Sequence, residues 1–467
     1  MLNMTLERIA QACGGQLYGS PEGDPAEVTC VVLDSRKIEQ GGLFVATEGA
    51  NVDGHKFIGQ VFEKGALAVV TEKTPEQVEQ QHGIPAGCWG VWILVEDSLQ
   101  ALKDIAEYYR SQLSIPVIGI TGSVGKTSTK EFIAGVLSRK YKVLKTEGNF
   151  NNEVGLPLTL LRIRPEHQAA VVEMGISDFG EMHRLSKMAK PDICVITNIG
   201  QCHLENLKSR EGILKAKTEI FDFMSKQGRV CVNGDDDMLA TLDHVKGQKV
   251  LRFGLGSGLD VYADAIEDNG LLGSKAALHL GEQTINIQVP LPGRHMVINA
   301  TAAALVAGLL GLSPEQIREG IAGVEAVSGR SHIMRLEKYT VIDDCYNANP
   351  VSMKAAIDLL GMARGRKVAV LGDMFELGEN SDALHAGVGR YAAEKGVDVI
   401  LCTGENSRHM YAGALKCAGS GQQVQWFATR AELLEQLPGL LQEGDGILVK
   451  ASHGMGFDKV VEALAKH

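Results

Sequence analysis

Beginning at Val117, short apolar runs alternate along the chain with stretches of helical periodicity. Such alternation predicts a doubly wound α/β domain built around a mainly parallel sheet. A segment in which polar and apolar residues alternate more strictly, 278–289, predicts an antiparallel addition, and 297–312 predicts the helix that follows. The apolar runs expected to form the parallel strands are 117–120, 169–174, 192–198 and 229–233.

The regions on either side of this pattern predict two further α/β domains. The first region begins with an amphipathic helix, followed by two apolar runs bounded by glycines. A helix expected over 99–112 ends before Pro116, because a residue that precedes proline is disfavoured in the helical conformation. From near Arg330 the α/β alternation repeats. We predict a small α/β N-terminal domain over 1–112, a central P-loop-type domain over 113–327 and a C-terminal Rossmann-like α/β domain over 328–467.

Length, composition and charge agree with three globular units and narrow the function. The chain has 467 residues, and a domain typically has about 150. Hydrophobic residues make up 45% and charged residues 22%, which is ordinary for globular proteins. With 46 Lys and Arg against 57 Asp and Glu, the net charge of −11 disfavours nonspecific nucleic-acid binding. Local cations and helix N-termini can still bind an anionic small molecule.

The chain start and the cysteines indicate a cytoplasmic protein. Residues 1–8 include an acid and no continuous apolar region, so we expect no secretory signal. The longest apolar stretch, 302–312, is too short to span a bilayer. Nine cysteines without CxxC pairing are typical of reduced thiols. We therefore expect a cytoplasmic protein without membrane insertion.

The strongest local signal is a glycine-rich turn, TGSVGKTS, between a predicted strand and a predicted helix. Its glycines allow backbone N–H groups to surround phosphate oxygens, its lysine supplies positive charge, and its first threonine after the lysine can bind magnesium. Ile120 occupies the position of the first Walker glycine, so the loop is a variant. The alternative is a glycine turn that only starts a helix. We predict an ATP-binding loop formed by Thr121, Gly122, Ser123, Val124, Gly125, Lys126, Thr127 and Ser128.

Three further residues follow predicted strands or lie in the next helix. Glu173 closes an apolar strand, where parallel sheets place ligand-facing side chains; it could equally be a solvated acid. His203 follows another strand and is either a ligand or a structural histidine. Lys217 lies among apolar residues of a predicted helix, where a lysine commonly extends its ammonium to water. Taken singly, each residue leaves both interpretations open.

Together these residues resemble the Mur ligase family. The TGxxGKT form of the loop is shared by Mur ligases and folylpolyglutamate synthases, and Lys126, Thr127, Glu173, His203 and Lys217 stand in the family's order. The resemblance implies that Lys217 is carbamylated, which turns a cation into an oxygen ligand for Mg²⁺. It also implies two Mg²⁺ ions, one at Thr127 and Glu173 and the other at His203 and the carbamate.

Other segments resemble the family's substrate and adenine sites. DSRKI at 34–38 resembles a uridine-binding first domain, in which Ser35 and Arg36 would contact the nucleotide sugar. The asparagine-rich segment after the loop implies a substrate contact by Asn152. A later helix matches the family's adenine contact through Asn299, although Met296 replaces the usual asparagine. The first two segments are also compatible with ordinary polar turns.

The third predicted domain resembles the family member that adds D-alanyl-D-alanine. Arg330 and Asp344 match ATP-contacting positions, and the segment YNANP is characteristic of that member. Two amides and a hydroxyl, Asn347, Asn349 and Ser352, would bind the polar ends of the dipeptide, or would only form a turn with the proline.

Two later segments bear on the same assignment. LGDMFELG, followed by His385, supports the D-alanyl-D-alanine-adding member. His453 stands where the family has arginine, which puts a guanidinium role at that position in doubt.

The resemblance implies an ATP-dependent ligase. The terminal carboxylate of UDP-N-acetylmuramoyl-tripeptide would take the γ-phosphate of ATP, and the amine of D-alanyl-D-alanine would attack the acyl phosphate. Closure of the third domain would assemble the site, and we expect a monomer. The alternatives are another Mur ligase, a folylpolyglutamate synthase-like ligase, or a noncatalytic nucleotide-binding paralogue. The implied catalytic residues are Lys126, Lys217, His203, Glu173 and Arg330.

Overall fold

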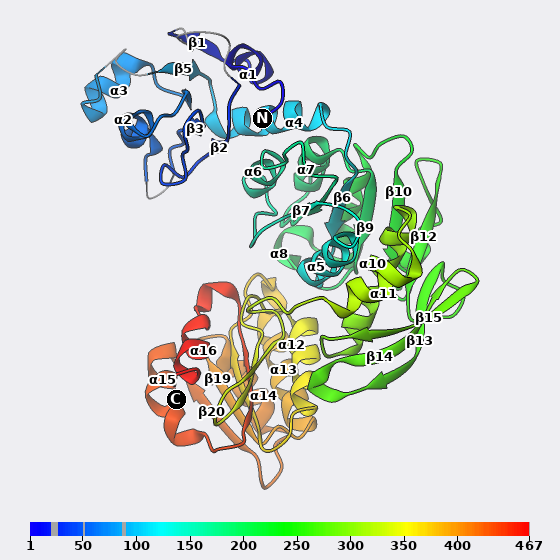
Figure 1. Ribbon diagram of the computed structural model, residues 1–467. Coiled ribbons are helices and arrows are strands. Elements are labelled where there is room, and N and C mark those ends of the chain that lie inside the picture. Colours follow the sequence, from blue (N-terminus) through cyan, green and yellow to red (C-terminus); the bar gives the residue numbers. More distant parts are fainter. Residues whose placement is uncertain (20–26, 50–51, 86–89, 467) are drawn as a thin grey trace.

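The chain folds into three α/β domains, each around its own sheet (Figure 1). The structure is a computed structural model that describes residues 1–19, 27–49, 52–85 and 90–466. The predicted fold class, with a central mainly parallel sheet and an α/β domain at each end, is confirmed. No helix in these ranges combines the length and apolar character needed to cross a membrane.

The first domain is a five-stranded sheet in the order β1-β5-β4-β3-β2, parallel except for β1. Its inner strands are short and apolar, which suits burial between helices. Its elements are α1 (Leu6–Ala12), β1 (Gln16–Tyr18), β2 (Val31–Val32), β3 (Leu43–Val45), η1 (Gly54–Phe57), α2 (Ile58–Glu63), β4 (Ala68–Thr71), α3 (Pro75–His82), β5 (Val91–Leu94) and α4 (Ser98–Ser111).

The second domain contains a sheet in the order β15-β14-β13-β12-β10-β9-β6-β8-β7. It is parallel from β7 to β13, and β14 and β15 form the predicted antiparallel addition. Its elements are β6 (Val117–Thr121), α5 (Lys126–Leu137), β7 (Val143–Lys145), α6 (Gly155–Leu160), β8 (Ala169–Glu173), α7 (Glu181–Ala189), β9 (Ile193–Ile196), α8 (Leu204–Leu207), α9 (Arg210–Thr218), η2 (Glu219–Phe221), β10 (Arg229–Asn233), η3 (Leu239–Thr241), β11 (His244–Val245), β12 (Gln248–Gly254), β13 (Val261–Asp268), η4 (Gly270–Leu272), β14 (Ser274–Leu280), β15 (Gln283–Val289), α10 (Arg294–Leu309) and α11 (Pro314–Ala322).

The strand order of this sheet places the phosphate loop at a switch point. The chain leaves β6 toward β7 on one side, and leaves the neighbouring strand β9 toward β10 on the other. Loops that diverge from the carboxyl ends of adjacent parallel strands open a crevice, which is where such folds bind ligands. The loops after β6 and β9 therefore enter the same crevice.

The third domain has a six-stranded sheet in the order β16-β17-β21-β18-β19-β20, parallel except for β16. Its elements are β16 (His332–Arg335), β17 (Thr340–Asp343), α12 (Pro350–Gly361), β18 (Lys367–Gly372), η5 (Gly378–Asn380), α13 (Ser381–Glu394), β19 (Val399–Thr403), α14 (Ser407–Leu415), β20 (Gln423–Phe427), α15 (Arg430–Leu440), β21 (Gly446–Lys450), η6 (His453–Met455) and α16 (Asp458–Leu464).

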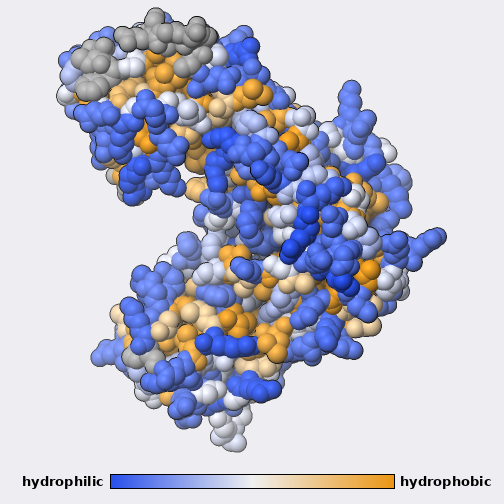
Figure 2. All heavy atoms as spheres, in the orientation of Figure 1, coloured by the Kyte–Doolittle hydropathy of each residue, from blue (hydrophilic) through white to orange (hydrophobic). Residues whose placement is uncertain are grey.

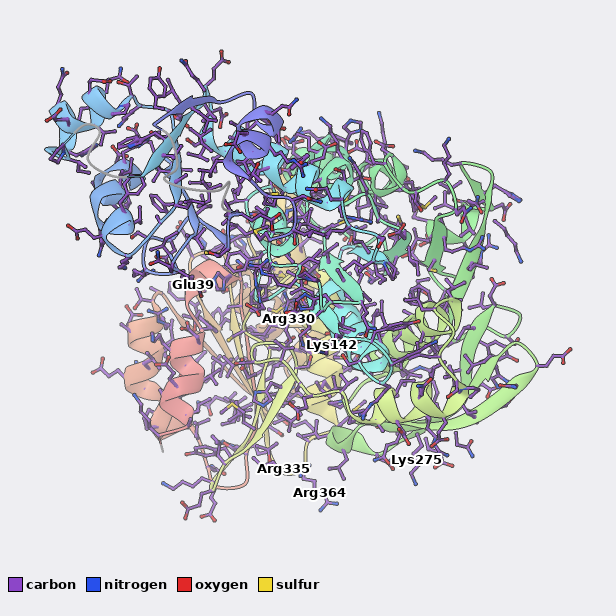
Figure 3. All side chains as sticks on the ribbon, turned by 45° about the horizontal axis from the view of Figure 1, so that its top comes forward. Glu39, Lys142, Lys275, Arg330, Arg335 and Arg364 are labelled. Carbon is purple, nitrogen blue, oxygen red and sulfur yellow. The ribbon has the colours of Figure 1, made fainter. Side chains whose placement is uncertain are left out.

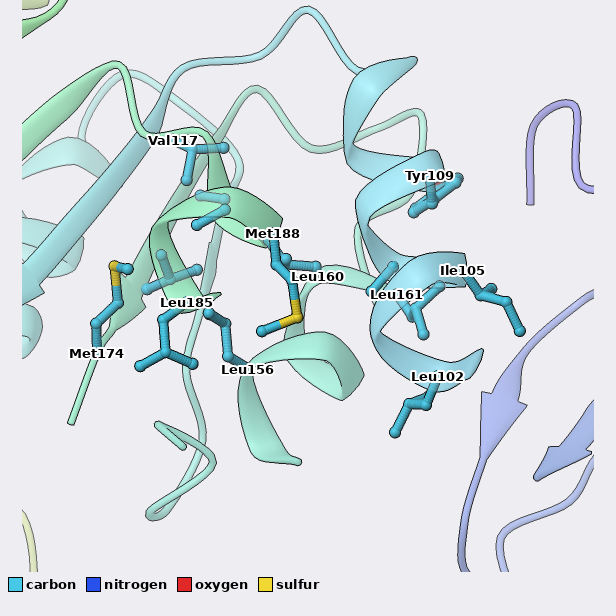
Figure 4. Packing of buried hydrophobic residues seen from close by; sticks show 14 of the residues in the cluster. Leu102, Ile105, Tyr109, Val117, Leu156, Leu160, Leu161, Met174, Leu185 and Met188 are labelled. Atoms are coloured by element: carbon cyan, nitrogen blue, oxygen red, sulfur yellow. The ribbon is translucent and has the colours of Figure 1, made fainter. Parts of the chain in front are cut away.

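Helix α4 joins the first two domains through one continuous hydrophobic core (Figure 4). Leu102, Ile105 and Tyr109 on α4 belong to the same buried cluster as Leu160 on α6 and Met188 on α7. The Tyr109 hydroxyl also donates a hydrogen bond to the carbonyl of Ile163, at 2.6 Å. Burying each large apolar side chain contributes about 1.5–3 kcal/mol, so the two domains are held together by packing.

The third domain adjoins the second through the segment that follows α11, and its two buried clusters contain no residue of the other domains, although Leu271 of the second domain packs against one of them. Figure 2 shows the surface hollowed between the first and third domains, with hydrophilic side chains along its edges. The molecule therefore consists of a fused pair of domains and a third domain that faces a cleft.

Candidate active site

A cavity of about 1030 Å³ lies between the second and third domains. Its volume is at the upper end of the range for small-molecule sites, about 300–1,000 Å³. Most of the residues selected from the sequence in these two domains line it: Ser123, Val124, Gly125, Lys126, Thr127, Ser128, Asn152, Glu173, His203, Asn299, Arg330, Asp344, Asn347, Asn349 and Ser352.

The phosphate loop connects β6 to α5 at this cavity. Gly122 and Gly125 have φ angles of +150° and +81°, and a Cβ on Gly122 would lie 1.9 Å from Oγ1 of Thr197. Glycine is therefore required at this close approach. The backbone N–H of Val124 donates a hydrogen bond to Oδ1 of Asn198, at 3.0 Å, which ties the loop to the segment after β9. This strand–turn–helix arrangement is the context that phosphate binding needs.

Thr127 and Glu173 form a buried oxygen pair at the base of the loop. Thr127 Oγ1 donates to Glu173 Oε2 at 2.9 Å, and Nδ2 of Asn151 donates to Oε1 at 2.8 Å. Glu173 closes β8 and is 1% exposed. A hydroxyl and a carboxylate are hard oxygen donors, so this pair suits Mg²⁺.

Asn151 is a site residue that the sequence analysis missed in favour of its neighbour. The side-chain Oδ1 of Asn152 accepts hydrogen bonds from the N–H groups of Val154 and Gly155, at 3.2 and 2.9 Å, and so shapes the turn before α6. An asparagine-rich turn does not reveal which amide points inward.

His203 and Lys217 come from the segments that follow β9. His203 precedes α8 in a left-handed conformation, with φ of +50°, and lines the cavity. Lys217, on α9, is 1% exposed and is not part of the cavity wall. Its burial, reinforced by the positive charge of Lys126, lowers its pKa to about 8. A substantial neutral fraction therefore exists at mildly alkaline pH.

Asn299 on α10 packs against the phosphate loop. Its Oδ1 accepts a hydrogen bond from Oγ1 of Thr129 at 3.0 Å, and a Cβ on Gly125 would lie 3.6 Å from the same oxygen. Its Nδ2 lies 3.6 Å from Sδ of Met296, a weak acceptor. The methionine that departs from the family pattern therefore contacts the predicted adenine-binding amide directly.

Arg330 enters the cavity from the third domain on an aromatic support. Its guanidinium lies 3.9 Å from the ring centre of Tyr346, and that ring lies 5.3 Å from the ring of His453. Figure 3 shows Arg330 toward the middle of the molecule, whereas Arg335 and Arg364 lie at its edge. Cation–π stacking holds the guanidinium plane in place. His453 thus supports Tyr346, a residue that the sequence analysis did not select.

Asp344 is held by a lysine that the sequence analysis also did not select. Its Oδ2 lies 2.5 Å from Nζ of Lys450, a residue 2% exposed, and its Oδ1 accepts from the N–H of Ser331 at 2.9 Å. Lys450 also donates to the carbonyl of Asn347 at 2.9 Å. One buried ammonium therefore positions both the Asp344 carboxylate and the turn that follows it.

The polar residues of the next turn divide into two groups. Asn349 caps α12, since its Oδ1 accepts from the N–H of Ser352 at 2.9 Å. Ser352 Oγ in turn accepts from the N–H of Asn349 at 3.0 Å. In Asn347 the side-chain Oδ1 accepts from the N–H of Ala348 at 2.8 Å, and the side-chain NH₂ group makes no hydrogen bond within the described ranges. Asn347 is therefore better placed to bind a ligand.

Ser35 and Arg36 lie on the first domain, outside the wall of this cavity. Ser35 is buried, and its carbonyl accepts from Nζ of Lys64 at 3.1 Å. The exposed Arg36 side chain makes two contacts of 2.9 Å with the Asp34 carboxylate. These residues remain candidates for a contact with an extended substrate.

Comparison with known proteins identifies the family. The chain is 35% identical over 469 residues to the UDP-N-acetylmuramoyl-tripeptide--D-alanyl-D-alanine ligase of Bacillus subtilis, covering 99% of both chains. The chain belongs to the Mur ligase family. It is also 34% identical to the ligase of the same name from Escherichia coli, over 100% of this chain and 99% of the other.

Family patterns and solved structures agree with this membership. The Mur ligase middle domain matches residues 120–307, the Mur ligase glutamate ligase domain 329–453, and the Mur ligase family catalytic domain 27–110. A MurF crystal structure from Acinetobacter baumannii superposes with a TM-score of 0.87 at 33% identity, covering 99% of both chains. The crystal structure of MurF from Thermotoga maritima in complex with ADP superposes with a TM-score of 0.79 at 28% identity, covering 94% of this Mur ligase and 97% of that chain.

The oxygen ligands that this Mur ligase offers, from Thr127 and Glu173, fit a magnesium ion bound partly by the protein and partly by phosphate. Among the described residues there is no cluster of three His, Cys, Asp or Glu side chains that could hold a metal alone. Mg²⁺ commonly binds through one or two protein oxygens, with water and phosphate oxygens completing an octahedron. Thr127 and Glu173 provide such a partial set beside the phosphate loop.

Proposed function

We infer that this protein is an ATP-dependent ligase that joins D-alanyl-D-alanine to UDP-N-acetylmuramoyl-tripeptide in peptidoglycan synthesis. The observation that carries this conclusion is that the phosphate loop and the YNANP turn line one cavity from opposite domains. A nucleotide on the loop and a dipeptide at the turn can then meet the same carboxylate. The full-length similarity to ligases of this name supports the same substrates.

The reaction brings together anionic groups that repel one another. The carboxylate of the tripeptide takes the γ-phosphoryl group, ADP leaves, and the dipeptide amine displaces phosphate from the acyl phosphate. Lys126 and the stacked Arg330 supply fixed positive charge on two sides of the cavity. Mg²⁺ at Thr127 and Glu173 would neutralise charge that develops on the transferred group. Catalysis therefore depends on position and charge rather than on a protein nucleophile.

The finer part of this proposal is a second Mg²⁺ at His203 and a carbamate on Lys217. The buried amine, with its pKa lowered to about 8, can be neutral and so can react with carbon dioxide. Carbamylation also removes the cost of burying a lone ammonium beside Lys126. The carbamate would supply an oxygen donor from the segment that follows His203 along the chain.

We further propose that each domain holds one substrate, with boundaries at 112/113 and 327/328. The first domain would bind the nucleotide sugar through Ser35 and Arg36, with Asn152 contacting the muramoyl part. The second would bind ATP through residues 121–128 and Asn299, and Arg330 and Asp344 would contribute from the third. The third domain would bind the dipeptide through Asn347, with Asn349 and Ser352 shaping its turn. The reaction uses cytoplasmic precursors, so we propose that the protein is cytoplasmic. We also propose that it acts as a monomer.

The test is phosphate release from ATP with each substrate omitted in turn. The proposal expects release only when both the UDP-muramoyl tripeptide and D-alanyl-D-alanine are present, with one new UDP-linked pentapeptide per phosphate. Tripeptides that carry lysine or diaminopimelate at the third position would then define the acceptor. Release that depends on glutamate instead of D-alanyl-D-alanine would overturn the assignment in favour of a folylpolyglutamate synthase-like ligase.

A further inference from the structure

The second and third domains touch across the cavity through His203 and Glu376. Nδ1 of the imidazole lies 2.6 Å from Oε2 of the carboxylate. His203 belongs to the loop after β9, and Glu376 to the loop after β18. Both residues line the cavity. This contact therefore bridges the two domains on the cavity wall itself.

The backbone on both sides of this contact is in the left-handed region. His203 has φ of +50° and Glu376 has φ of +61°, a conformation that residues with a Cβ rarely adopt. A Cβ on Gly378 would lie 3.7 Å from Cα of Glu205, so the two loops approach each other closely. Unfavourable backbone conformations persist where surrounding structure enforces them, and they concentrate at functional sites.

Hydrogen bonds within the third domain hold the loop that carries Glu376. The buried His385 accepts the N–H of Met374 at its Nε2, at 3.0 Å, and the Ser452 hydroxyl accepts the N–H of Phe375 at 2.9 Å. Asp373 accepts both the N–H and the hydroxyl of Ser407, at 2.7 and 2.6 Å. The carboxylate of Glu376 is thus presented by a loop held at three successive residues.

We propose that Glu376 is a positioning residue that orients the His203 imidazole for Mg²⁺. A histidine that binds a metal through one ring nitrogen usually donates its other N–H to a carboxylate, which fixes the tautomer and the ring plane. Nδ1 is buried and its one short polar contact among the described residues is with Glu376, at the distance but not the angle of a hydrogen bond; the proposed bond would use this nitrogen and leave Nε2 for the ion. The orienting carboxylate comes from the other domain, so this metal position is complete only when the third domain is docked.

This inference rests on the proposed role of His203 as a metal ligand, and metal binding can be measured without turnover. Mn²⁺ replaces Mg²⁺ in a titration followed by electron paramagnetic resonance, with the full-length protein, bicarbonate and a non-hydrolysable ATP analogue. We expect two bound ions in the native protein. Glu376→Ala should weaken only the second, by about 10–100-fold. Glu376→Gln keeps an oxygen acceptor for the ring N–H and should retain more of the affinity.

The matched control is Glu379→Gln, an exposed acid of the same loop region, which should bind both ions normally. Equal second-ion affinity in Glu376→Ala and the native protein, while His203→Ala loses that ion, overturns the role of Glu376 alone. A native protein that binds one ion, as His203→Ala also does, overturns the metal assignment and this inference with it. Unchanged thermal melting of Glu376→Ala shows that lost affinity is not lost folding.

Discussion

Lys126 and Lys130 lie one turn apart on α5 in different surroundings. Lys126 lines the cavity and donates one hydrogen bond, at 2.9 Å, to the Gly122 carbonyl. Lys130 is 2% exposed and donates to the carbonyl of Thr146 at 2.7 Å. The first lysine is placed for a ligand, and the second joins α5 to the segment after β7.

We expect Lys126→Ala to abolish ATP-dependent phosphate release while leaving the melting temperature close to native. Lys130→Ala is the contrasting variant, because it leaves a buried carbonyl without its partner, at a cost of about 1–3 kcal/mol. It should lower the melting temperature. Measuring both properties in both variants separates charge from packing. A normal rate in well-folded Lys126→Ala would falsify the phosphate-loop assignment.

At Lys217, activity should depend on dissolved carbon dioxide. Rates should fall in carbonate-free, mildly acidic buffer, in which the amine is protonated, and recover when bicarbonate is added. Lys217→Ala and Lys217→Arg should both be inactive, because neither can carry the carbamate. Near-native turnover by Lys217→Arg contradicts the carbamate.

The same residue predicts a pH dependence of stability in carbonate-free buffer. The folded protein releases the Lys217 proton near pH 8, whereas the ordinary pKa is 10.5. Between these values the unfolded state binds more protons, so stability rises with pH. We expect the native protein to gain stability relative to Lys217→Met across this window, as followed by thermal melting. Parallel curves for the two proteins would count against a lowered pKa.

At the scale of elements, the start of α12 combines a helix cap with a predicted binding turn. Asn349 and Ser352 satisfy each other's backbone N–H groups in a capping box. A substitution there acts on the helix before it acts on any ligand. Asn347 lies just outside the helix and leaves its amide NH₂ group available.

We therefore expect different effects from two neighbouring asparagine substitutions. Asn349→Ala removes the cap and should cost ~1 kcal/mol of stability, visible as a lower melting temperature. Asn347→Ala should raise the KM for D-alanyl-D-alanine by about 5- to 150-fold, since leaving a buried polar partner unpaired costs about 1–3 kcal/mol, and should leave the KM for ATP unchanged. If Asn347→Ala raised only the KM for ATP, the dipeptide assignment would be wrong.

How far the sequence predicts each element depends on whether its signal is local. Buried strands such as β6 and β8 lack polar side chains up to their last residue, and the glycines of the loop between β6 and α5 mark its turn. No local pattern of this kind reveals the site roles of Asn151, Tyr346, Lys450 and Glu376. Each acts through a partner that the fold brings from elsewhere, such as the Lys450 ammonium on Asp344, 106 residues away along the chain.

At the scale of the whole molecule, the predicted substrates are divided among domains that are joined unequally. The first two domains share a core, and the third contributes Arg330, Asp344 and Glu376 to the cavity wall. Movement of the third domain would expose or enclose the acyl phosphate. The uridine end would stay on the fused pair throughout.

A substitution at Arg36 tests whether the first domain binds the nucleotide sugar separately from the other two substrates. We expect Arg36→Ala to raise the KM for the UDP-muramoyl tripeptide and leave the KM values for ATP and D-alanyl-D-alanine unchanged, because its side chain lies outside the cavity. Arg8→Ala is a suitable control, an exposed arginine of α1 in the same domain. Steady-state kinetics with one substrate varied at a time gives the answer. An equal rise in all three KM values would indicate a general disturbance of the fold.

The core shared through α4 also determines how the chain can be divided. A break near residue 112 would strip α4 of its partners on α6 and α7 and leave Ile105 and Tyr109 facing water. The isolated first domain would then expose an apolar surface along α4 and would tend to aggregate. A break near residue 327 leaves every buried cluster whole, because the third domain shares with the second only surface contacts such as His203–Glu376 and Leu271. Residues 1–327 and 328–467, expressed from two genes, should therefore fold independently and reassemble. A chain divided into three pieces, near residue 112 as well as near residue 327, should not reassemble.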